Sequence, residues 1–504
     1  MRKRDKTPGG FRVREIRLDT TEQPGGSPGR VDREDRSRNT ELVIVTYLFV
    51  LLFALLIGTV VWINTIGHGS LVSNVNNTKK DSSADKVIRG SIVTENGTQL
   101  AVTNVDADGR ESRYYPYGQM FSHVVGYATN GKGGLEASMN NDLLSTHSSL
   151  MSQLRSEENS EKLHGDNVIV TLDPKLQEAA WYALGSNRGA VVVMEPDSGK
   201  ILAMVSKPDF DPNTISQEWE SMVADTANSA LLNRASQGRY PPGSTFKILT
   251  TLAYLREHPT DFESFSYDCT GSLTRGDVTI NCYNWEVHGP EDLEGAFAHS
   301  CNTAYANIGL GLDNAKFRNV AESFCFNSTL PTTFPHSESI FRLTSGSPEE
   351  EQMTTAIGQG DTLVTPLHMC MIASTVANGG IMMKPYCVSR VETYDGEVVE
   401  ETKPAIYKEL MSADEAQVLT RYMKATVSYG TAQELGWGWY SSAGKTGSAE
   451  YETNGTTGTH SWFVGFSNPD DPDLAIAVIA EDGGTGSETA VPIAHAVFDA
   501  WYSY

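Results

Sequence analysis

The longest apolar run of the chain lies near its N-terminus. Residues 42–63 read LVIVTYLFVLLFALLIGTVVWI and contain no charged residue. About 20 apolar residues, each rising about 1.5 Å along a helix, span the hydrocarbon core of a bilayer. Tyr47 and Trp62 lie towards the two ends of the run, where aromatic rings favour the interface. A cleaved signal peptide is the alternative, but the run is too long and no small-residue cleavage site follows it. The pattern therefore predicts one transmembrane helix.

Polar segments flank this run on both sides. Residues 1–41 are rich in Arg, Asp, Gly and Pro and show no apolar periodicity, which predicts a disordered tail. Residues 64–86 are polar and rich in Ser and Asn, which predicts a stalk. Arginine precedes the apolar run and is absent immediately after it. The N-terminus is therefore predicted to be cytoplasmic and the rest of the chain extracytoplasmic, in a single-pass protein of the cell membrane.

Beyond the stalk the pattern changes to short strands. The stretch RGSIVTENGTQLAVT alternates apolar and polar residues around Asn96-Gly97. An Asn-Gly pair between two such runs is a strong signal for a β-hairpin. We expect a small mixed module at residues 87–163.

The main domain is predicted at residues 164–504. Residues 168–172 form a candidate strand, followed by a helix with Asp173 as its cap and Pro174 at its first position. The stretch GAVVVMEPDSGKILAMVS contains two buried strands, and SWFVGF with LAIAVIAE forms another pair near the C-terminus. Strands at both ends and a helical middle predict an α+β fold, in which helices flank one antiparallel sheet.

Charge excludes one class of partner. The formal net charge is −24, from 39 basic and 63 acidic residues. Nucleic-acid binding relies on clustered Lys and Arg that neutralise phosphates. We therefore expect no nucleic-acid partner.

The chain has six cysteines, all beyond the apolar run: Cys269, Cys282, Cys301, Cys325, Cys370 and Cys387. None belongs to a CxxC pair or has a metal-ligand spacing with histidine, which argues against zinc. Cys269 and Cys282 bracket a short polar stretch. They either close a disulfide in an oxidising compartment or remain two thiols, and the sequence leaves both open.

Three short motifs carry candidate chemistry. In chain order they are Ser244-Thr245-Phe246-Lys247, Ser300-Cys301-Asn302 and Lys445-Thr446-Gly447. Penicillin-binding proteins and class A β-lactamases contain this set. Each motif alone is weak evidence. The S-x-x-K pattern recurs at residues 83–86 and 442–445, and S-x-N recurs at residues 138–140.

The surroundings of Ser244 favour it over the other serines. Residues 240–243, YPPG, form a rigid lead-in, and an apolar helical run follows at residues 246–255. Ser244 is thus expected at a helix N-terminus, where backbone N–H groups favour developing negative charge. Lys247 lies on the same face of that helix. Burial would lower its pKa, so that it can accept the serine proton.

The other two motifs supply polar groups and a strand edge. Ser300 and Asn302 follow a helical stretch and can relay a proton and hold a substrate amide. Lys445 opens a Gly-rich strand edge, KTGSAE, where Gly447 lets a substrate backbone approach closely.

At these residues the chain resembles the class B penicillin-binding proteins, and the resemblance covers about residues 87–504. Its landmarks include RGSIVTENGTQLA, VTLDPKLQEAA, NRASQGRYPPGSTFK, IGQGDTLVTPL and GKTGSAE followed by HSWFVGF. The resemblance implies the penicillin-binding and serine β-lactamase-like transpeptidase fold, with a membrane-proximal pedestal at residues 87–163.

The resemblance also implies the reaction. Ser244 would attack the penultimate D-Ala carbonyl of a peptidoglycan stem peptide and form an acyl-enzyme, with Lys247 as general base. Ser300 would carry the proton to the leaving group, and Asn302 would orient the peptide. Lys445 would supply positive potential. β-Lactams would acylate the same serine.

Substrate binding is assigned in the same way. Thr446 and Ser448 would bind the terminal carboxylate beside Gly447, and the backbone N–H groups of Ser244 and Ser448 would form the oxyanion hole. No metal and no organic cofactor are implied. The expected partner is a polytopic membrane glycosyltransferase, contacted through the span and the pedestal.

Four alternatives compete with a transpeptidase. A class A β-lactamase needs a Glu-x-x-x-Asn motif, which is missing between Asn302 and Lys445. A carboxypeptidase, which passes the acyl group to water, stays open. The intact motifs argue against a non-catalytic scaffold, and the short tail argues against a β-lactam sensor.

Overall fold

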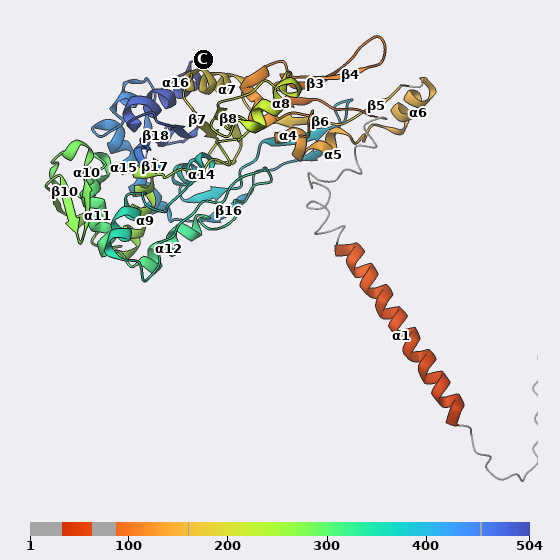
Figure 1. Cartoon of the computed structure of the whole chain (residues 1–504), viewed down its shortest axis with the longest axis horizontal. Coiled ribbons are helices and arrows are strands. Elements are labelled where there is room, and N and C mark those ends of the chain that lie inside the picture. The colour runs from red at the N-terminus through yellow and green to blue at the C-terminus, as the bar shows by residue number, and fades with distance from the viewer. Residues whose placement is uncertain (1–32, 63–86, 160, 454–455, 504) are drawn as a thin grey trace, which may run out of the picture. The chain divides into compact units, whose positions relative to one another are not determined.

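The computed structural model describes residues 33–62, 87–159, 161–453 and 456–503. The chain divides into two compact units, residues 1–71 and residues 72–504. The first unit contains one described helix. The second unit contains both large sheets and all other described helices (Figure 1).

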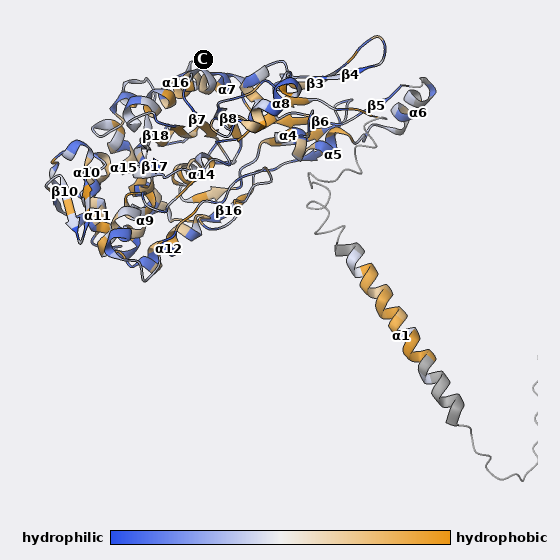
Figure 2. Ribbon diagram, in the orientation of Figure 1, coloured by the Kyte–Doolittle hydropathy of each residue, from blue (hydrophilic) through white to orange (hydrophobic). Residues whose placement is uncertain are grey.

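Helix α1 (Arg33–Trp62) is apolar on every face along its centre (Figure 2). Its segment Leu42–Thr59 has a mean hydropathy of 2.7 and no buried residue. A helix that is hydrophobic all round requires an apolar environment, such as a bilayer. Within the described residues, α1 is the one helix long and apolar enough to cross a membrane.

Helix α1 begins earlier than the predicted span. Residues 33–41, predicted as part of a disordered tail, instead continue the helix. A helix nucleated by an apolar segment extends readily into polar neighbours, because each added residue gains a hydrogen bond. Residues 1–32 and the predicted stalk at residues 64–86 lie outside the described residues.

The second unit is built on a five-stranded antiparallel sheet. In spatial order its strands are β17 (Ser442–Thr453), β18 (Thr456–Ser467), β19 (Ala475–Ala480), β7 (Gly189–Met194) and β8 (Ile201–Lys207). Strands from the beginning and the end of the domain thus meet in one sheet, which confirms the predicted α+β architecture.

Helices cover both faces of this sheet (Figure 1). Val192 of β7 packs into a core with α14 (Pro366–Ala377). Its neighbour Val191 packs into the opposite core, with α7 (Pro174–Leu184) and α16 (Val491–Tyr502). Successive side chains of a strand point to opposite faces. Because both faces are covered, strand β7 is apolar at every position.

A second, six-stranded sheet takes strands from both sides of residue 163. In spatial order they are β15 (Val398–Glu401), β14 (Val388–Glu392), β6 (Asn167–Val170), β2 (Ile92–Thr94), β3 (Gln99–Val105) and β4 (Glu111–Tyr114). Strands β2 and β3 form the predicted hairpin, and Gly97 in its turn has a φ of +87°, which glycine adopts readily. Strand β2 pairs in parallel with β6, so strand pairing joins the N-terminal module to the main domain.

A buried ion cluster lies in the N-terminal module. The Glu136 side chain is 0% exposed, and its carboxylate accepts hydrogen bonds of 2.7 Å from Arg89 Nε and Arg113 Nε. Burial by itself would raise the pKa of Glu136, but the two guanidinium groups outweigh burial and lower that pKa. The three charges therefore depend on one another inside the module.

The remaining elements of the second unit complete the fold. The helical segments are η3 (Gly118–Phe121), α3 (Ser122–Val125), α4 (Gly134–Ser138), α5 (Asn140–Leu143), α6 (Leu150–Asn159), α8 (Ile215–Ala224), η5 (Phe262–Ser264), α12 (Asn314–Ser323), α13 (Glu349–Ala356), α15 (Ala413–Ser428), η7 (Gln433–Trp437) and η8 (Gly486–Ala490). The strands are β1 (Val87–Ile88), β5 (Leu163–His164), β13 (Ile381–Met383) and β16 (Ile406–Glu409).

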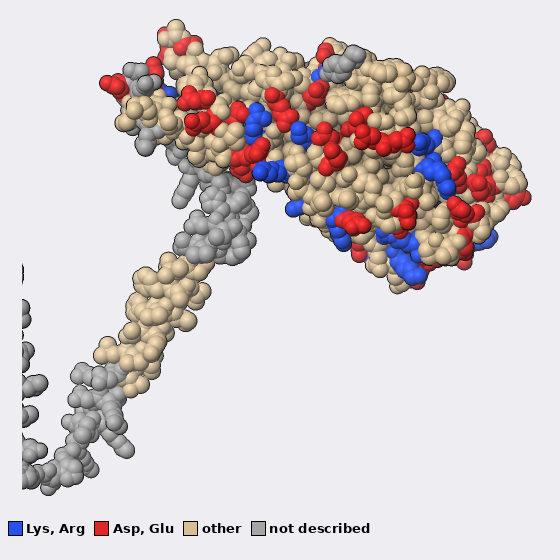
Figure 3. All heavy atoms as spheres, turned by 180° about the vertical axis from the view of Figure 1, so that it is seen from behind, with Lys and Arg blue, Asp and Glu red and all other residues tan. Residues whose placement is uncertain are grey.

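The surface charge is mixed. On the face shown in Figure 3, acidic and basic side chains alternate and form no continuous basic stripe.

Candidate active site

Ser244 lies in the 3-10 helix η4 (Gly243–Phe246), which leads directly into α9 (Lys247–Glu257). The serine is 9% exposed and stands in the first helical turn, as the sequence predicts. Gly243 before it has a φ of +54°, and a Cβ there would lie 2.9 Å from the Ser448 carbonyl oxygen. Glycine at this position therefore lets the strand that carries Ser448 approach the Ser244 turn.

Lys247 is fully buried and reaches across to the S-x-N motif. Its Nζ donates to Ser300 O at 2.7 Å, to Ser300 Oγ at 3.2 Å and to Asn302 Oδ1 at 2.8 Å. An ammonium group has three N–H donors, and this motif accepts from all of them. Within the described residues, no hydrogen bond joins Lys247 to Ser244.

Burial also changes the acidity of this amine. Removal from water lowers the pKa of Lys247 to about 7, while the nearby thiols of Cys301 and Cys282 act in the opposite direction. The Nζ atom lies 5.1 Å from the ring centroid of Tyr305. With a pKa near neutrality, a substantial fraction of Lys247 is uncharged and can accept a proton.

Ser300 lies at the junction between α10 (Leu293–Ala298) and α11 (Asn302–Gly311). It has a φ of +58°, a left-handed backbone that costs a non-glycine residue about 1–3 kcal/mol. Cys301 caps α11, because its Sγ accepts a hydrogen bond from Ala304 N at 3.4 Å. The surrounding contacts therefore hold Ser300 in a conformation that it would not adopt alone.

The side chain of Asn302 is held at both ends. Its Nδ2 donates to Asn281 O at 3.0 Å, at the end of strand β11 (Val278–Asn281). Its Oδ1 accepts from Lys247. The amide therefore has one orientation, set by a strand on one side and by the buried lysine on the other.

The third motif lies on β17, the edge strand of the five-stranded sheet: Lys445, Thr446, Gly447 and Ser448. Thr446 Oγ1 forms a hydrogen bond with Thr431 Oγ1, and Ser448 Oγ accepts from Gly486 N at 3.4 Å. An edge strand has backbone groups free to pair with an added strand.

Strand β17 packs tightly against the Ser244 turn at Gly447. A Cβ on Gly447 would lie 3.0 Å from Thr245 Cγ2, 3.1 Å from Pro242 O and 3.2 Å from Trp462 Cβ. The indole of Trp462 also donates to Pro241 O at 3.0 Å. Close approach at glycine thus brings the K-T-G strand to the nucleophile.

Lys445 is the second fully buried lysine of the site. Its Nζ donates to Thr446 O at 3.1 Å and lies 5.6 Å from the ring centroid of Phe297. Burial, and then the charge of Lys247, hold the pKa of Lys445 well below its ordinary value. The fold therefore brings all three predicted motifs together. An anionic ligand beside Lys445 would favour its protonated form.

Sequence reasoning missed Gln359, which it quoted only within a family landmark. In the amide orientation that satisfies both groups, the Gln359 side chain donates to Glu450 O at 3.1 Å and accepts from Glu450 N at 3.0 Å. Gln359 therefore occupies the edge of β17 just beyond Ser448. Only packing of a distant loop reveals this contact.

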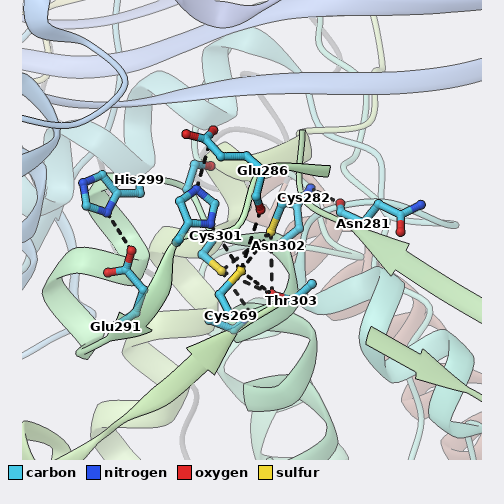
Figure 4. Close-up of polar contacts among 12 residues, drawn as sticks. Cys269, Asn281, Cys282, Glu286, Glu291, His299, Cys301, Asn302 and Thr303 are labelled. Atoms are coloured by element: carbon cyan, nitrogen blue, oxygen red, sulfur yellow. Dashed lines mark hydrogen bonds and ion pairs between the residues drawn. The ribbon is translucent and has the colours of Figure 1, made fainter. Parts of the chain in front are cut away.

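Sequence reasoning also missed a cluster beside the S-x-N motif: Cys269, Cys282, His288 and Cys301. The three cysteines converge in Figure 4. The four ligand atoms lie within 4.8 Å of one another, so this set can hold a metal ion. The Sγ atoms of Cys269 and Cys282 are 3.7 Å apart and unbonded. Familiar ligand spacings along the sequence predicted no zinc site, whereas the fold joins ligands that lie at longer and uneven intervals.

A serine at the start of a helix, with a buried amine of lowered pKa one turn later, can serve as a nucleophile with a nearby base. Comparison with known proteins shows the family to which the chain belongs. Residues 189–499 match the family model described as the penicillin binding protein transpeptidase domain, and residues 89–168 match the penicillin binding protein A dimerisation domain. The chain belongs to the penicillin-binding protein transpeptidase family.

Relatives and solved structures agree with this family. Peptidoglycan D,D-transpeptidase PbpA of Mycolicibacterium smegmatis is 34% identical over 441 residues, which cover 82% of this chain and 88% of the relative. The ceftriaxone acyl-enzyme complex of penicillin-binding protein A from M. tuberculosis superposes with a TM-score of 0.77 at 31% identity, over 84% of this chain and 99% of that one. The D,D-transpeptidase domain of a peptidoglycan glycosyltransferase from Eggerthella lenta superposes with a TM-score of 0.75 at 31% identity. The match covers 83% of this chain and 99% of that one. The predicted family and fold are confirmed.

We expect Gly447→Ala to lower the free energy of unfolding by about 1–3 kcal/mol, because the added methyl group meets atoms on three sides. Urea unfolding of the full-length protein in detergent measures this change. Gly311→Ala is the matched control, since a Cβ at Gly311 meets no atom within 4 Å. It should leave stability unchanged or raise it. Equal stability of the two variants would contradict the tight contact at Gly447.

Proposed function

We propose that this chain is a peptidoglycan D,D-transpeptidase that cross-links stem peptides through an acyl-enzyme on Ser244. The observation that carries the proposal is the position of Lys247, a fully buried amine one helical turn from Ser244. A relative of 34% identity is named a peptidoglycan D,D-transpeptidase, and a structural relative has been solved as a β-lactam acyl-enzyme. Both support the proposal.

The first step forms the ester. The neutral amine of Lys247 accepts the hydroxyl proton of Ser244 while Oγ attacks the penultimate D-Ala carbonyl carbon. The oxyanion is assigned to the backbone N–H groups of Ser244 and Ser448. When the tetrahedral intermediate collapses, the C–N bond breaks and the terminal D-Ala leaves with the proton. The acyl group stays on Ser244.

Ser300 can carry that proton. Neutral Lys247 has two N–H groups, which suffice for Ser300 O at 2.7 Å and Asn302 Oδ1 at 2.8 Å. Its lone pair is then free to take a proton from Ser244, and the charged amine can pass one to Ser300 Oγ at 3.2 Å. Asn302, fixed at both ends, orients the peptide beside this relay.

The substrate is proposed to add as a strand to the edge of β17. Gly447 keeps this edge close to the Ser244 turn, and the hydroxyls of Thr446 and Ser448 bind the terminal carboxylate. That carboxylate also supplies the anion that the buried charge of Lys445 lacks. Binding of the anion therefore favours the protonated form of Lys445.

The second step separates a transpeptidase from a carboxypeptidase. An amino group of a neighbouring stem peptide attacks the ester, forms the cross-linking amide and returns the Ser244 hydroxyl. Water in the same position would give hydrolysis instead. A β-lactam acylates the same serine, and the opened ring stays attached.

We further propose that α1 anchors the chain in the cell membrane, with its N-terminus in the cytoplasm and the catalytic domain outside. The proposed partner is a polytopic membrane glycosyltransferase that contacts α1 and the module at residues 87–163. This module matches a dimerisation-domain model and contains none of the motif residues.

We expect the partner to be lost when an unrelated transmembrane helix replaces residues 42–63. Replacement removes side chains that would pack against the partner's helices. Co-purification from detergent measures recovery of the glycosyltransferase, with the unaltered chain as control. Undiminished recovery would contradict a contact through α1.

We expect full-length protein in detergent to gain one stable adduct with penicillin G, and Ser244→Ala to gain none. Intact-mass measurement detects the acyl group. Ser442→Ala is the matched control, because Ser442 belongs to the competing S-x-x-K motif and its buried hydroxyl has no hydrogen-bond partner among the described residues. It should retain the adduct. An adduct on Ser244→Ala would contradict the assignment of the nucleophile.

We expect the rate of acylation by a fluorescent penicillin to rise with pH through about 7 and then level off, following the pKa of Lys247. The sign follows from the chemistry: only the uncharged amine accepts the serine proton, and it predominates above that pKa. Stopped-flow fluorescence between about pH 5.5 and 8.5 measures the profile. Lys247→Arg should abolish acylation, since arginine stays charged. A rate that is flat or falls over this range would contradict Lys247 as the base.

A further inference from the structure

The cluster beside the S-x-N motif draws its side chains from separate elements. Cys269 ends β9 (Tyr267–Cys269), and Cys282 follows the β10 (Ser272–Arg275) and β11 hairpin. His288 lies between η6 (Tyr283–Trp285) and β12 (Gly289–Glu291), and Cys301 caps α11. All three cysteines are at most 3% exposed, and the His288 side chain is 9% exposed. The group therefore faces the protein interior.

The distances fit the edges of a tetrahedron around zinc. With Zn–S bonds of about 2.3 Å, neighbouring sulfur atoms lie about 3.8 Å apart. Cys282 Sγ is 3.7 Å from both Cys269 Sγ and Cys301 Sγ. His288 Nδ1 is 3.3 Å from Cys269 Sγ, and a Zn–N bond of about 2.0 Å predicts about 3.5 Å. A disulfide needs about 2.05 Å and would use only two of the four groups.

Groups around the cluster suit metal-bound ligands. The Thr303 hydroxyl lies 3.2 Å from Cys269 Sγ, 3.3 Å from Cys301 Sγ and 3.6 Å from Cys282 Sγ, so it can donate to a thiolate (Figure 4). The other ring nitrogen of His288, Nε2, lies 3.8 Å from the Glu286 carboxylate. At this distance the carboxylate makes no hydrogen bond, but its charge favours a proton on Nε2, and Nδ1 is the nitrogen that faces the thiols.

We propose that Cys269, Cys282, Cys301 and His288 bind one structural Zn²⁺ ion. Thiolate and imidazole ligands select zinc over Mg²⁺ and Ca²⁺, which prefer oxygen. On binding, the three thiols each release a proton to solvent and imidazole binds as the neutral ring. Four protein ligands complete the tetrahedron and leave no open position, so the ion holds structure and takes no part in catalysis.

The ion would hold the S-x-N motif in place through Cys301, its middle residue. Cys301 lies between Ser300, with its left-handed backbone, and Asn302. Cys282 follows Asn281, whose carbonyl oxygen accepts from Asn302 Nδ2. A metal that joins Cys301 to Cys282 therefore sets the distance between the turn and the strand that orients Asn302. The cluster is thus a positioning device for the proton relay.

The test begins with metal content. Full-length protein, purified in detergent without added metal, should contain one zinc per chain by inductively coupled plasma mass spectrometry. Denaturation with a chelator should then release six titratable thiols. Absence of zinc overturns the proposal, whether six thiols are found or only four because Cys269 and Cys282 have formed a disulfide.

Variants localise the ion. Cys282→Ser should bind zinc at least about tenfold more weakly. The buried Cys387→Ser, outside the cluster, should keep its zinc. His288→Cys should also keep zinc, because four cysteines form a structural zinc site. If Cys282→Ser fails to fold, the zinc content of the wild type and of His288→Cys still tests the proposed site. Zinc retained by folded Cys282→Ser at unchanged affinity overturns the assignment of ligands.

The positioning role rests on the proposed function and is tested separately. Removal of zinc by a chelator should slow acylation by penicillin about tenfold, and added Zn²⁺ should restore the rate. Ser244→Ala should keep its full zinc content while it forms no adduct. Zinc without wild-type acylation would reject the proposed function and leave the metal site intact. Acylation unchanged by loss of zinc would reject the positioning role alone.

Discussion

The site depends on one buried amine. Lys247 has no contact with water, so every N–H group must find an acceptor inside the protein. The backbone and side chains of Ser300 and Asn302 provide these acceptors. The S-x-N turn must therefore pack against α9, and the strained backbone of Ser300 and the fixed amide of Asn302 are conditions of that packing. The same burial brings the pKa of the amine to about 7, within reach of serine chemistry.

Close backbone approach is the second constraint. Gly243 and Gly447 stand where the Ser244 turn meets strand β17, and a side chain at either glycine would force its neighbours to shift. Without this approach, the K-T-G strand would lie too far from the nucleophile to hold a substrate. Because β17 is an edge strand, the same geometry leaves a side available for an added strand.

The side chains of the S-x-N turn point to two different sets of neighbours. Ser300 and Asn302 face the buried lysine, while Cys301 between them points into the cluster of thiols and imidazole. A metal in that cluster would stiffen the turn without entering the reaction. In the proposed metal site, Cys301 supplies a soft ligand at the middle position of a motif whose outer positions are polar.

Much of this protein follows from local signals in the sequence. The Asn96-Gly97 hairpin, the Asp173 cap, the strand pairs and the helix after Ser244 are all present in the structure. Each depends on neighbours along the chain, through periodicity, turn residues or a capping side chain. A sequence reports such features directly, and the family resemblance added the order of the motifs.

Tertiary structure alone decided the remaining contacts. Lys247 reaches the S-x-N motif, Gln359 meets strand β17, and Cys269 meets Cys301 across long stretches of chain. The six-stranded sheet likewise joins strands that no local pattern pairs. Such contacts depend on how whole elements pack around a common core, and packing is a property of the folded chain that spacing along the sequence does not contain.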